Sequence, residues 1–502
     1  MSKPFTTYID FKSSMGLDER DDRYCVLREK VLDKRGLFPS ADFEPETLSN
    51  GFEPQKLIYG SGNWAIGKDD NHDIAFYSIN TGSSFSETYR GGHASDDLAD
   101  AIYYNDGVSE DLIYGIDTSG DVFTFNTSTY IYTSGVHTSF ATGGGQLVQY
   151  HPSTDNLYYI SGYKIYKQNG TTFSGTLKTL PNNFTYKKMI AYKDWMLIIA
   201  ENNTTNEINA FFYDIINEPN FFDNNKFIGF GNYLGGGVLE GVFTCLISVN
   251  QRFNSKEQSG GIQIKQFNGS QFKLKNSLKA IRNQVHQSNR THNEYCDGGY
   301  LYIGFNDWTI YPGIYRINVY GEVVSLGKPD NFNPISNSGK FICIIKYMED
   351  MVVGYKENNG EYKLAQISDY SGSENDLREP FTYIEGFHGD TTVTKQLRSF
   401  TVSFTMTEIN FNEEVVKVYY RIIDPYNIDN EVDEINSWTQ ILEYDYDIDG
   451  QADIKTVTME NAINTLPEYK EIEFKITGEK GANITGAKFQ SQAIKDDIID
   501  YE

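Results

Sequence analysis

The sequence predicts an all-β fold, in which a seven-bladed β-propeller is followed by a C-terminal antiparallel β-sandwich that is jelly-roll-like. Three observations predict it. A two-strand pattern recurs seven times, aromatic side chains (37 Tyr, 32 Phe and 4 Trp in 502 residues) mark its strands, and its period is lost near residue 390 while alternating strands continue. The predicted domains are therefore an N-terminal arm (1–50), the propeller (51–390) and the sandwich (391–502).

The repeated module opens with a short apolar strand. Its seven copies begin at Trp64, Leu112, Leu157, Trp195, Cys245, Leu301 and Met351. The first and last starts lie 287 residues apart, so the six intervals have a mean near 48. Four strands in a period in the forties describe one propeller blade. A β-solenoid would repeat far more often, and a long β-sandwich would not repeat one motif in order.

A second strand follows in each module and is rich in β-branched and aromatic residues, the pattern of a strand. These second strands are expected at 74–79, 122–125, 163–166, 210–213, 262–264, 314–317 and 362–364. Several end in a glycine turn, as in Asn268-Gly269 and Tyr320-Gly321, because glycine accepts the positive φ of a tight hairpin. An apolar residue then starts an outer strand, as Phe272 does.

The flanking segments differ from the module. Within 1–50, the run 24–32 predicts a short helix, and the whole arm would either lie on a neighbouring subunit or close the propeller ring as a strap. Residues 368–380 are polar and linker-like. Six alternating strands are then expected at 397–404, 415–420, 438–442, 454–457, 472–476 and 483–489. So many strands in about 110 residues suit an antiparallel sandwich.

One local motif predicts a metal site. Asp445, Asp447, Asp449 and Asp453 occupy positions 1, 3, 5 and 9 of a loop that has a glycine at position 6. Such carboxylates, with the carbonyl of Gln451 at position 7, form a hard oxygen shell that suits Ca²⁺. Strands flank the loop and position 12 is not Glu, so the motif differs from a helix-loop-helix site. A solvated acidic hairpin is the alternative interpretation.

Charge narrows the range of partners. The chain has 43 basic and 69 acidic residues and a net charge of −26, which argues against tight binding of nucleic acid or anionic lipid. No apolar run reaches the roughly 18 residues of a transmembrane helix, so no membrane insertion is expected. The first residues show no secretory signal pattern.

Cysteine and histidine spacing favours free thiols over a disulfide framework or zinc. Cys245 and Cys343 lie in apolar runs and are expected to be buried. His286, His292 and Cys296 lack the close spacing and the fourth ligand of a zinc site.

No catalytic constellation is predicted. The sequence has no nucleophile elbow, zinc-protease helix motif or phosphate loop, and the run 115–123 only approaches the Asp-box of sialidase propellers, with its glycine one position late. The acidic runs 69–73 and 95–100 are interpreted as exposed blade loops. The protein is therefore predicted not to be an enzyme.

The layout of arm, seven-fold aromatic propeller and sandwich resembles virion proteins of tailed bacteriophages, especially tail hub or nozzle proteins of short-tailed phages. In the sandwich the resemblance lies in Val418-Tyr-Tyr-Arg421, Ser437-Trp438, 473–476 and 483–489. It implies a non-catalytic structural protein, made in the host cytoplasm and located in the virion tail. Its partners would be other copies of itself in a ring and neighbouring tail or portal-adaptor proteins. DNA would pass through that ring as a transient passenger.

Two other functions stay open. A propeller adhesin could bind a receptor or host glycan through blade loops and exposed aromatic side chains. A polysaccharide-degrading propeller enzyme would need two paired carboxylates, which cannot be singled out among 69 acidic residues.

Overall fold

The computed structural model describes the chain in segments. They are 5–10, 26–28, 30–33, 36–39, 43–47, 52–60, 62–69, 73–80, 84–90, 97–105, 111–137, 145–169, 172–217, 223–249, 261–279, 293–305, 313–327, 329, 339–347, 350–357, 359–367, 381–387, 393–406, 415–423, 439–445, 455–460, 468–469, 471–478 and 482–496. Every helix or strand element in these segments is a β-strand. None of them is a helix of the length and apolarity that crossing a membrane requires.

Seven small antiparallel sheets follow one another along the described part of the chain. Their strands are β6 (Glu53–Tyr59), β7 (Asn63–Lys68), β8 (Ile74–Asn80), β9 (Ser84–Arg90); β10 (Leu98–Asn105), β11 (Asp111–Asp117), β12 (Val122–Asn126), β13 (Tyr132–His137); β14 (Gln146–His151), β15 (Asn156–Ser161), β16 (Lys164–Asn169), β17 (Thr172–Phe173), β18 (Lys178–Thr179); and β19 (Phe184–Tyr192), β20 (Trp195–Asn202), β21 (Glu207–Asp214), β22 (Asp223–Phe230). The series continues with β23 (Asn232–Leu239), β24 (Val242–Val249), β25 (Gly261–Phe267), β26 (Phe272–Lys279); β27 (Glu294–Cys296), β28 (Tyr300–Phe305), β29 (Gly313–Asn318), β30 (Val323–Gly327); and β31 (Lys340–Tyr347), β32 (Asp350–Lys356), β33 (Tyr362–Ile367) with β5 (Phe43–Thr47).

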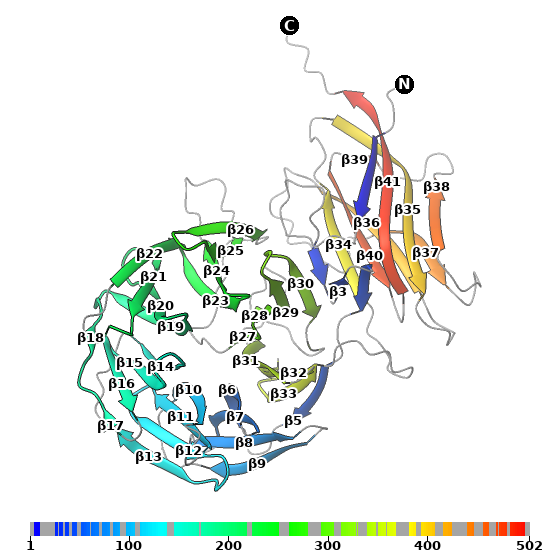
Figure 1. The fold of residues 1–502 in the computed structure, drawn as a ribbon. Helices are drawn as coiled ribbons and strands as arrows, with labels where there is room; N and C mark the ends of the chain where they lie inside the picture. Colours follow the sequence, from blue (N-terminus) through cyan, green and yellow to red (C-terminus); the bar gives the residue numbers. More distant parts are fainter. Residues whose placement is uncertain are drawn as a thin grey trace.

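The sheets form a closed ring, the arrangement of a β-propeller (Figure 1). The first strand of each sheet lies against the first strand of the next, from β6 through β10, β14, β19, β23 and β27 to β31, and β31 returns to β6. The strands expected from the repeated module are confirmed as the second and third strands of these sheets. The apolar start at Trp64, for example, lies in β7, and the run at 74–79 is β8.

Aromatic side chains fill the space between neighbouring sheets. Phe76 of β8 stacks on Phe125 of β12 in the next sheet, with ring centroids 4.0 Å apart and an interplanar angle of 8°. Farther along, Phe212 of β21 packs on Phe267 of β25 at 4.7 Å. Both contacts belong to cores made of buried residues from two sheets. Neighbouring sheets are twisted relative to one another, and aromatic side chains are large enough to fill the space between them. The high aromatic content therefore stabilises the ring.

The N-terminal segment completes the last sheet. Strand β5 pairs antiparallel with β33, with Pro45 opposite Ala365. Among the described strands β5 pairs with β33 alone and so forms the outer edge of its sheet, where a proline without an N–H is tolerated. The ring thus joins a strand from the start of the chain to three strands that follow residue 339.

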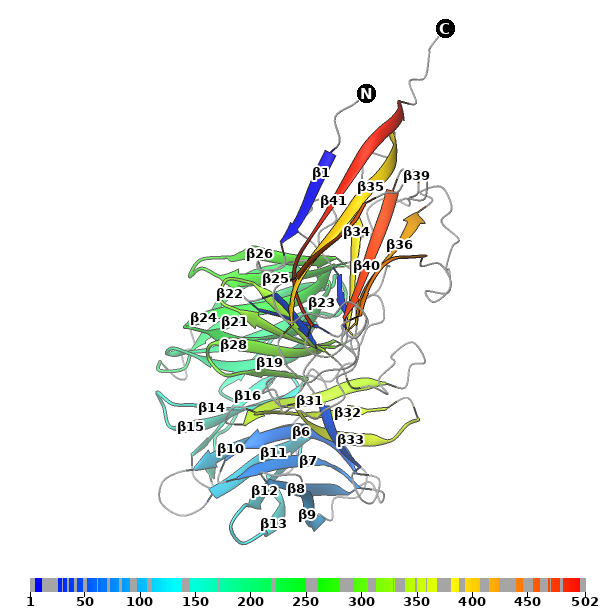
Figure 2. The same cartoon turned by 90° about the vertical axis from the view of Figure 1, so that its right-hand side faces the viewer.

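Two larger sheets form a second unit beside the ring, and Figure 2 shows their long strands extending away from it. One sheet contains β1 (Phe5–Asp10), β3 (Lys30–Asp33), β4 (Gly36–Pro39), β35 (Val393–Met406), β38 (Lys455–Glu460), β39 (Glu468–Tyr469) and β41 (Ala482–Asp496). The other contains β2 (Val26–Arg28), β34 (Phe381–Phe387), β36 (Val415–Ile423), β37 (Thr439–Asp445) and β40 (Glu471–Gly478). Phe400 of the first packs on Phe474 of the second, with centroids 4.8 Å apart.

Both ends of the chain contribute to this unit. β1 pairs with β41 over six residues, and β2 pairs with β34, which lies before the predicted boundary at 390. The short helix predicted for 24–32 is wrong over its described residues, since 26–28 and 30–33 are strands. The pairing with β34 and β4 outweighs the weak local preference for a helix.

A glycine between the fourth and fifth sheets gives a test of ring packing. Gly231 has φ +131°, and a Cβ there would overlap the carbonyl oxygen of Ser248. Gly231→Ala is expected to lower the free energy of unfolding by about 2–4 kcal/mol, because strain and a backbone clash add. Denaturant titration would measure it. Gly175→Ala, where a Cβ meets open space, is the control and should stay within about 0.5 kcal/mol; equal effects would contradict the prediction.

Candidate functional site

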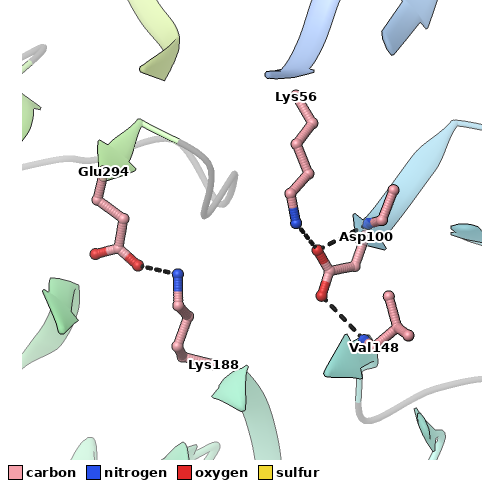
Figure 3. Close-up of polar contacts among 6 residues, drawn as sticks. Lys56, Asp100, Val148, Lys188 and Glu294 are labelled. Carbon is pink, nitrogen blue, oxygen red and sulfur yellow. Dashed lines mark hydrogen bonds and ion pairs between the residues drawn. The ribbon is translucent and has the colours of Figure 1, made fainter. Parts of the chain in front are cut away.

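Four charged side chains form two ion pairs inside the ring, and we call them the central charge cluster (Figure 3). Lys56 comes from β6, Asp100 from β10, Lys188 from β19 and Glu294 from β27, all of them first strands of their sheets. First strands line the axis of the ring, so these residues face one another although 238 positions separate the first from the last.

Asp100 joins three sheets at this axis. One carboxylate oxygen pairs with Lys56 Nζ and accepts the N–H of Ala101 at 2.9 Å. The other accepts the N–H of Val148, on the first strand of the following sheet, at 3.0 Å. The Asp100 side chain is only 10% exposed. A buried carboxylate that accepts an ammonium and peptide N–H groups in this way fixes the spacing of the strands around it.

Glu294 has the same role on the opposite arc of the ring. Its carboxylate lies 2.7 Å from Lys188 Nζ and accepts the N–H of Gly236 on β23. The Glu294 side chain is 2% exposed and that of Lys188 29%. A side chain at position 236 would collide with Thr244 and Cys245, so glycine there permits the close approach of the neighbouring backbone.

The pKa shifts follow from this geometry. Burial lowers the pKa of Lys56, although Asp100 beside it opposes the change. Burial raises the pKa of Glu294, against the opposing effect of Lys188. Burial alone would lower the pKa of Lys188, but the carboxylates of Glu294 and Asp100 raise it above the ordinary value. Because Asp100 acts on both lysines, the four groups form one electrostatic network.

The cluster is suited to holding sheets together. Each of its carboxylates is already bound by an ammonium and by peptide N–H groups, an arrangement that leaves little freedom for proton transfer to a substrate. Asp100 was interpreted from sequence as part of an exposed loop; that interpretation is wrong, since it is buried in β10. No spacing pattern could have singled it out, because the partner lysine lies 44 positions away.

Other acidic residues singled out from sequence form turns. Asp69 accepts the N–H of Asp73 at 2.9 Å and Asp117 accepts that of Asp121 at 2.8 Å. Each lies where the second strand of its sheet ends. Its carboxylate accepts a backbone N–H within the hairpin turn, in place of a backbone carbonyl. Both are buried, so the description of 69–73 as an exposed loop does not hold for Asp69, and the near Asp-box at 115–123 is a turn.

The predicted calcium loop lies almost entirely outside the described residues. Asp445 is the last residue of β37, while Asp447, Asp449, Gln451 and Asp453 are not among the residues described. His286 and His292 also lie outside them. Within the described segments, no three His, Cys, Asp or Glu side chains are grouped so as to hold a metal ion. Cys245 and Cys343 are free and buried, as predicted.

A second candidate site is a tyrosine surface between the second and third sheets, made of Tyr104, Tyr150 and Asp155. The two rings lie with centroids 5.0 Å apart. Both hydroxyls donate to the Asp155 carboxylate, at 3.2 and 3.0 Å. Asp155 is exposed and has φ +53°, a backbone conformation uncommon for a residue with a side chain. Partly exposed aromatic rings beside an exposed carboxylate present both an apolar face and a hydrogen-bond acceptor.

His151, at the end of β14, links the third sheet to the fourth. Its Nε2 lies 3.2 Å from the carbonyl oxygen of Trp195, and its Nδ1 lies 3.2 Å from the amide nitrogen of Ser153. In the neutral ring with hydrogen on Nε2, Nε2 donates to the carbonyl of Trp195 and Nδ1 accepts the N–H of Ser153, so both partners are satisfied. Burial lowers the pKa of His151, and the carbonyl of Trp195, the carboxylate of Asp194 and the backbone of Lys193 oppose this change only in part.

Protonation of His151 should therefore destabilise the ring. A histidine whose folded pKa is lowered contributes stability that is complete above its unfolded pKa near 6.5 and is lost as pH falls below it. Urea unfolding from pH 8 to pH 5 should show a decline, of at most about 1.4 kcal/mol per pH unit for one proton. His151→Gln should flatten that slope, and an unchanged slope would assign the acid sensitivity to other groups.

No family model matches the chain, and no curated protein matches it. Among solved structures, it is similar to YCF48 bound to D1 peptide, with a TM-score of 0.42 and 9% sequence identity, over 65% of this chain and 97% of that one.

Proposed function

We propose that the seven consecutive sheets are the blades of a seven-bladed propeller, that the two larger sheets form a β-sandwich, and that the protein is a non-catalytic structural component of a short-tailed phage tail. It would assemble with other copies of itself into a hub- or nozzle-like ring, next to tail and portal-adaptor proteins of the virion. The observation that carries this proposal is the use of the chain ends: β5 completes the ring, while β1 to β4 lie in the two larger sheets.

Because strands of the N-terminal segment take part in both units, the two units resist mechanical separation, as a structural protein of a tail requires. To separate the two units, strands from residues 5–47 would have to leave sheets on both sides. The central charge cluster supports the proposal in a second way. Its charged side chains project into the ring from the first strands (Figure 3), so we place the DNA channel in the ring of subunits and not in a single chain. A net charge of −26 would keep DNA from binding to the wall of that channel.

Particles made without this protein test the proposal. They are expected to lack the tail or to lose packaged DNA, and antibodies or mass spectrometry should find the protein in purified wild-type virions. Tailed, DNA-filled particles without the protein would overturn the proposal. The same particles, supplied with Asp447→Ala protein, offer a readout of the calcium loop in its assembled state.

We also propose that the acidic loop 445–453 binds Ca²⁺. Millimolar Ca²⁺ should raise the melting temperature of the purified protein, because a ligand that binds only the folded state stabilises it. Asp447→Ala removes a carboxylate at position 3 of the loop and should abolish the shift, while Mg²⁺, which prefers fewer protein ligands and a smaller shell, is the control ion. No shift in the wild type would end this claim.

The tyrosine surface favours a second function, binding of a host glycan. Aromatic faces pack on the apolar faces of sugars, and the Asp155 carboxylate can accept sugar hydroxyls. A glycan array should then show a signal that falls at least tenfold in Tyr104→Ala and Tyr150→Ala. Tyr320→Ala is the control, since Tyr320 is 74% exposed on another sheet. No bound glycan, or equal loss in the control, would remove this function.

A further inference from the structure

An apolar and basic patch lies on the outer rim of the ring, where the fourth and fifth sheets meet. Three large apolar side chains are exposed there: Phe227 (49%), Phe230 (56%) and Leu274 (55%). Lys273 and Lys275, on either side of Leu274, are exposed as well. We call these five residues the rim patch. Large apolar side chains that gather on a surface, instead of lying singly, indicate a site of contact with another molecule.

The strands explain why the three apolar residues share one surface, whereas Lys273 and Lys275 alternate with Leu274 along the edge strand β26 and flank that surface on its other face. Phe227 and Phe230 lie on β22 with ring centroids 5.1 Å apart, and β22 lies beside β26, which carries Leu274 (Figure 1). Leu274 is opposite Lys265 in the register of β25 and β26, so both side chains are on one face of the sheet. Lys265 Nζ reaches the carbonyl oxygen of Ile228 at 2.7 Å. That bond fixes this face against β22.

The charge of the patch is opposite to that of the chain. Strands β25 and β26 and the turn between them, residues 261–279, contain no Asp or Glu but four lysines, namely Lys265, Lys273, Lys275 and Lys279. The whole chain has a net charge of −26, so the remainder has −26 − 4 = −30. A basic surface of this kind repels the same basic surface on another copy of the chain, and it is attracted to the acidic remainder of that copy.

We infer that the rim patch docks on the acidic surface of a second copy of this chain, a contact that would build the ring named in the proposed function and that rests on it. We take the contact to be heterologous, because a two-fold contact centred on the patch would place Lys273 and Lys275 against the same lysines of the partner. Heterologous contacts repeat from copy to copy and close into rings when the rotation permits. The exposed Phe and Leu side chains form the apolar centre of the contact, and the lysines form its polar border.

Sedimentation velocity of the full-length protein tests this inference. The wild type should associate in a concentration-dependent way, and raising salt from about 0.05 M to about 0.5 M should weaken the association, since exposed charges are screened. Lys273→Glu/Lys275→Glu should weaken it at least tenfold, as should Leu274→Asp. Lys164→Glu/Lys167→Glu, on β16 of another sheet, is the charge-matched control. Unchanged melting temperatures would show that the variants fold.

Mixing the wild type with the charge-reversed variant distinguishes a heterologous contact from a two-fold contact. In a heterologous assembly, excess Lys273→Glu/Lys275→Glu protein offers only its acidic surface, so it should cap wild-type chains and shorten the assemblies. In a two-fold contact centred on the patch, the variant's glutamates would face the lysines of the wild type and the mixture would associate more tightly than the wild type, which would overturn the inference.

Three other results would also overturn the inference. They are a wild type that stays monomeric at all concentrations, a rim variant that associates like the wild type, and a variant that loses only duplex-DNA binding. A rim variant that still assembles leaves the proposed function intact, because another surface could then form the ring. Tailed particles without the protein remove the proposed function without deciding whether the chain self-associates.

Discussion

Replacing Glu294 by Leu is expected to lower the free energy of unfolding by about 3 kcal/mol, near the lower end of the range for breaking a buried ion pair. The change would leave Lys188 without its close carboxylate and the N–H of Gly236 without its acceptor. Unpaired groups of this kind cost more than the pair itself contributes. Denaturant unfolding followed by tryptophan fluorescence would measure the change.

Two variants make this prediction specific. Glu361→Leu breaks an exposed pair with Lys363, in which the Glu361 side chain is 56% exposed, and should change the stability far less, because water screens exposed pairs. Glu294→Leu combined with Lys188→Met should recover a large part of the loss, because no unpaired charge then stays at the axis. Equal costs for Glu294→Leu and Glu361→Leu would show that the central charge cluster does not hold the ring.

The second large effect is expected from closing the ring covalently. Pro45 and Ala365 are directly opposite each other in β5 and β33, so Pro45→Cys/Ala365→Cys places two cysteines within reach of a disulfide. The bond would close a loop of about 320 residues, for which chain entropy predicts a stabilisation of about 6 kcal/mol. The melting temperature with and without reductant measures the effect.

The same variant distinguishes two uses of the N-terminal segment. If β5 closes the ring of its own chain, the oxidised protein migrates as a single chain on denaturing gels. If β5 is exchanged between copies, the disulfide joins two chains. The nearby pair Phe43→Cys/Ala365→Cys, which is out of register by two residues, should form the bond poorly and is the control.

The strands of the ring could be predicted because their signal is local. Each module places an apolar strand and an alternating strand between turn residues, and these became β7 with β8, β11 with β12, and so on around the ring. The buried positions of Cys245 and Cys343 follow from the same local pattern. The first strand of each sheet carried a weaker signal, because it mixes charged with apolar residues, as Lys56 and Asp100 show.

Pairing over long distance could not be predicted. Nothing in the residues 43–47 indicates a partner at 363–367, and nothing at 26–28 indicates one at 382–384. A short strand gains little from its own sequence, so its conformation depends on the edge that it meets in the fold. This is also why the expected helix at 24–32 is replaced by strands over its described residues.

The repeat period, the aromatic strands and the net charge of −26 follow from the sequence alone, because each is a property of residues that are neighbours along the chain or simply counted. Three features depend on the tertiary structure. They are the closure of the ring by β5, the meeting of Lys56, Asp100, Lys188 and Glu294 at its axis, and the joining of Phe227, Phe230 and Leu274 into one rim patch. In each case the interacting groups come from segments far apart in the sequence, and only the folded ring brings those segments together, since burial between them outweighs the entropy of ordering them.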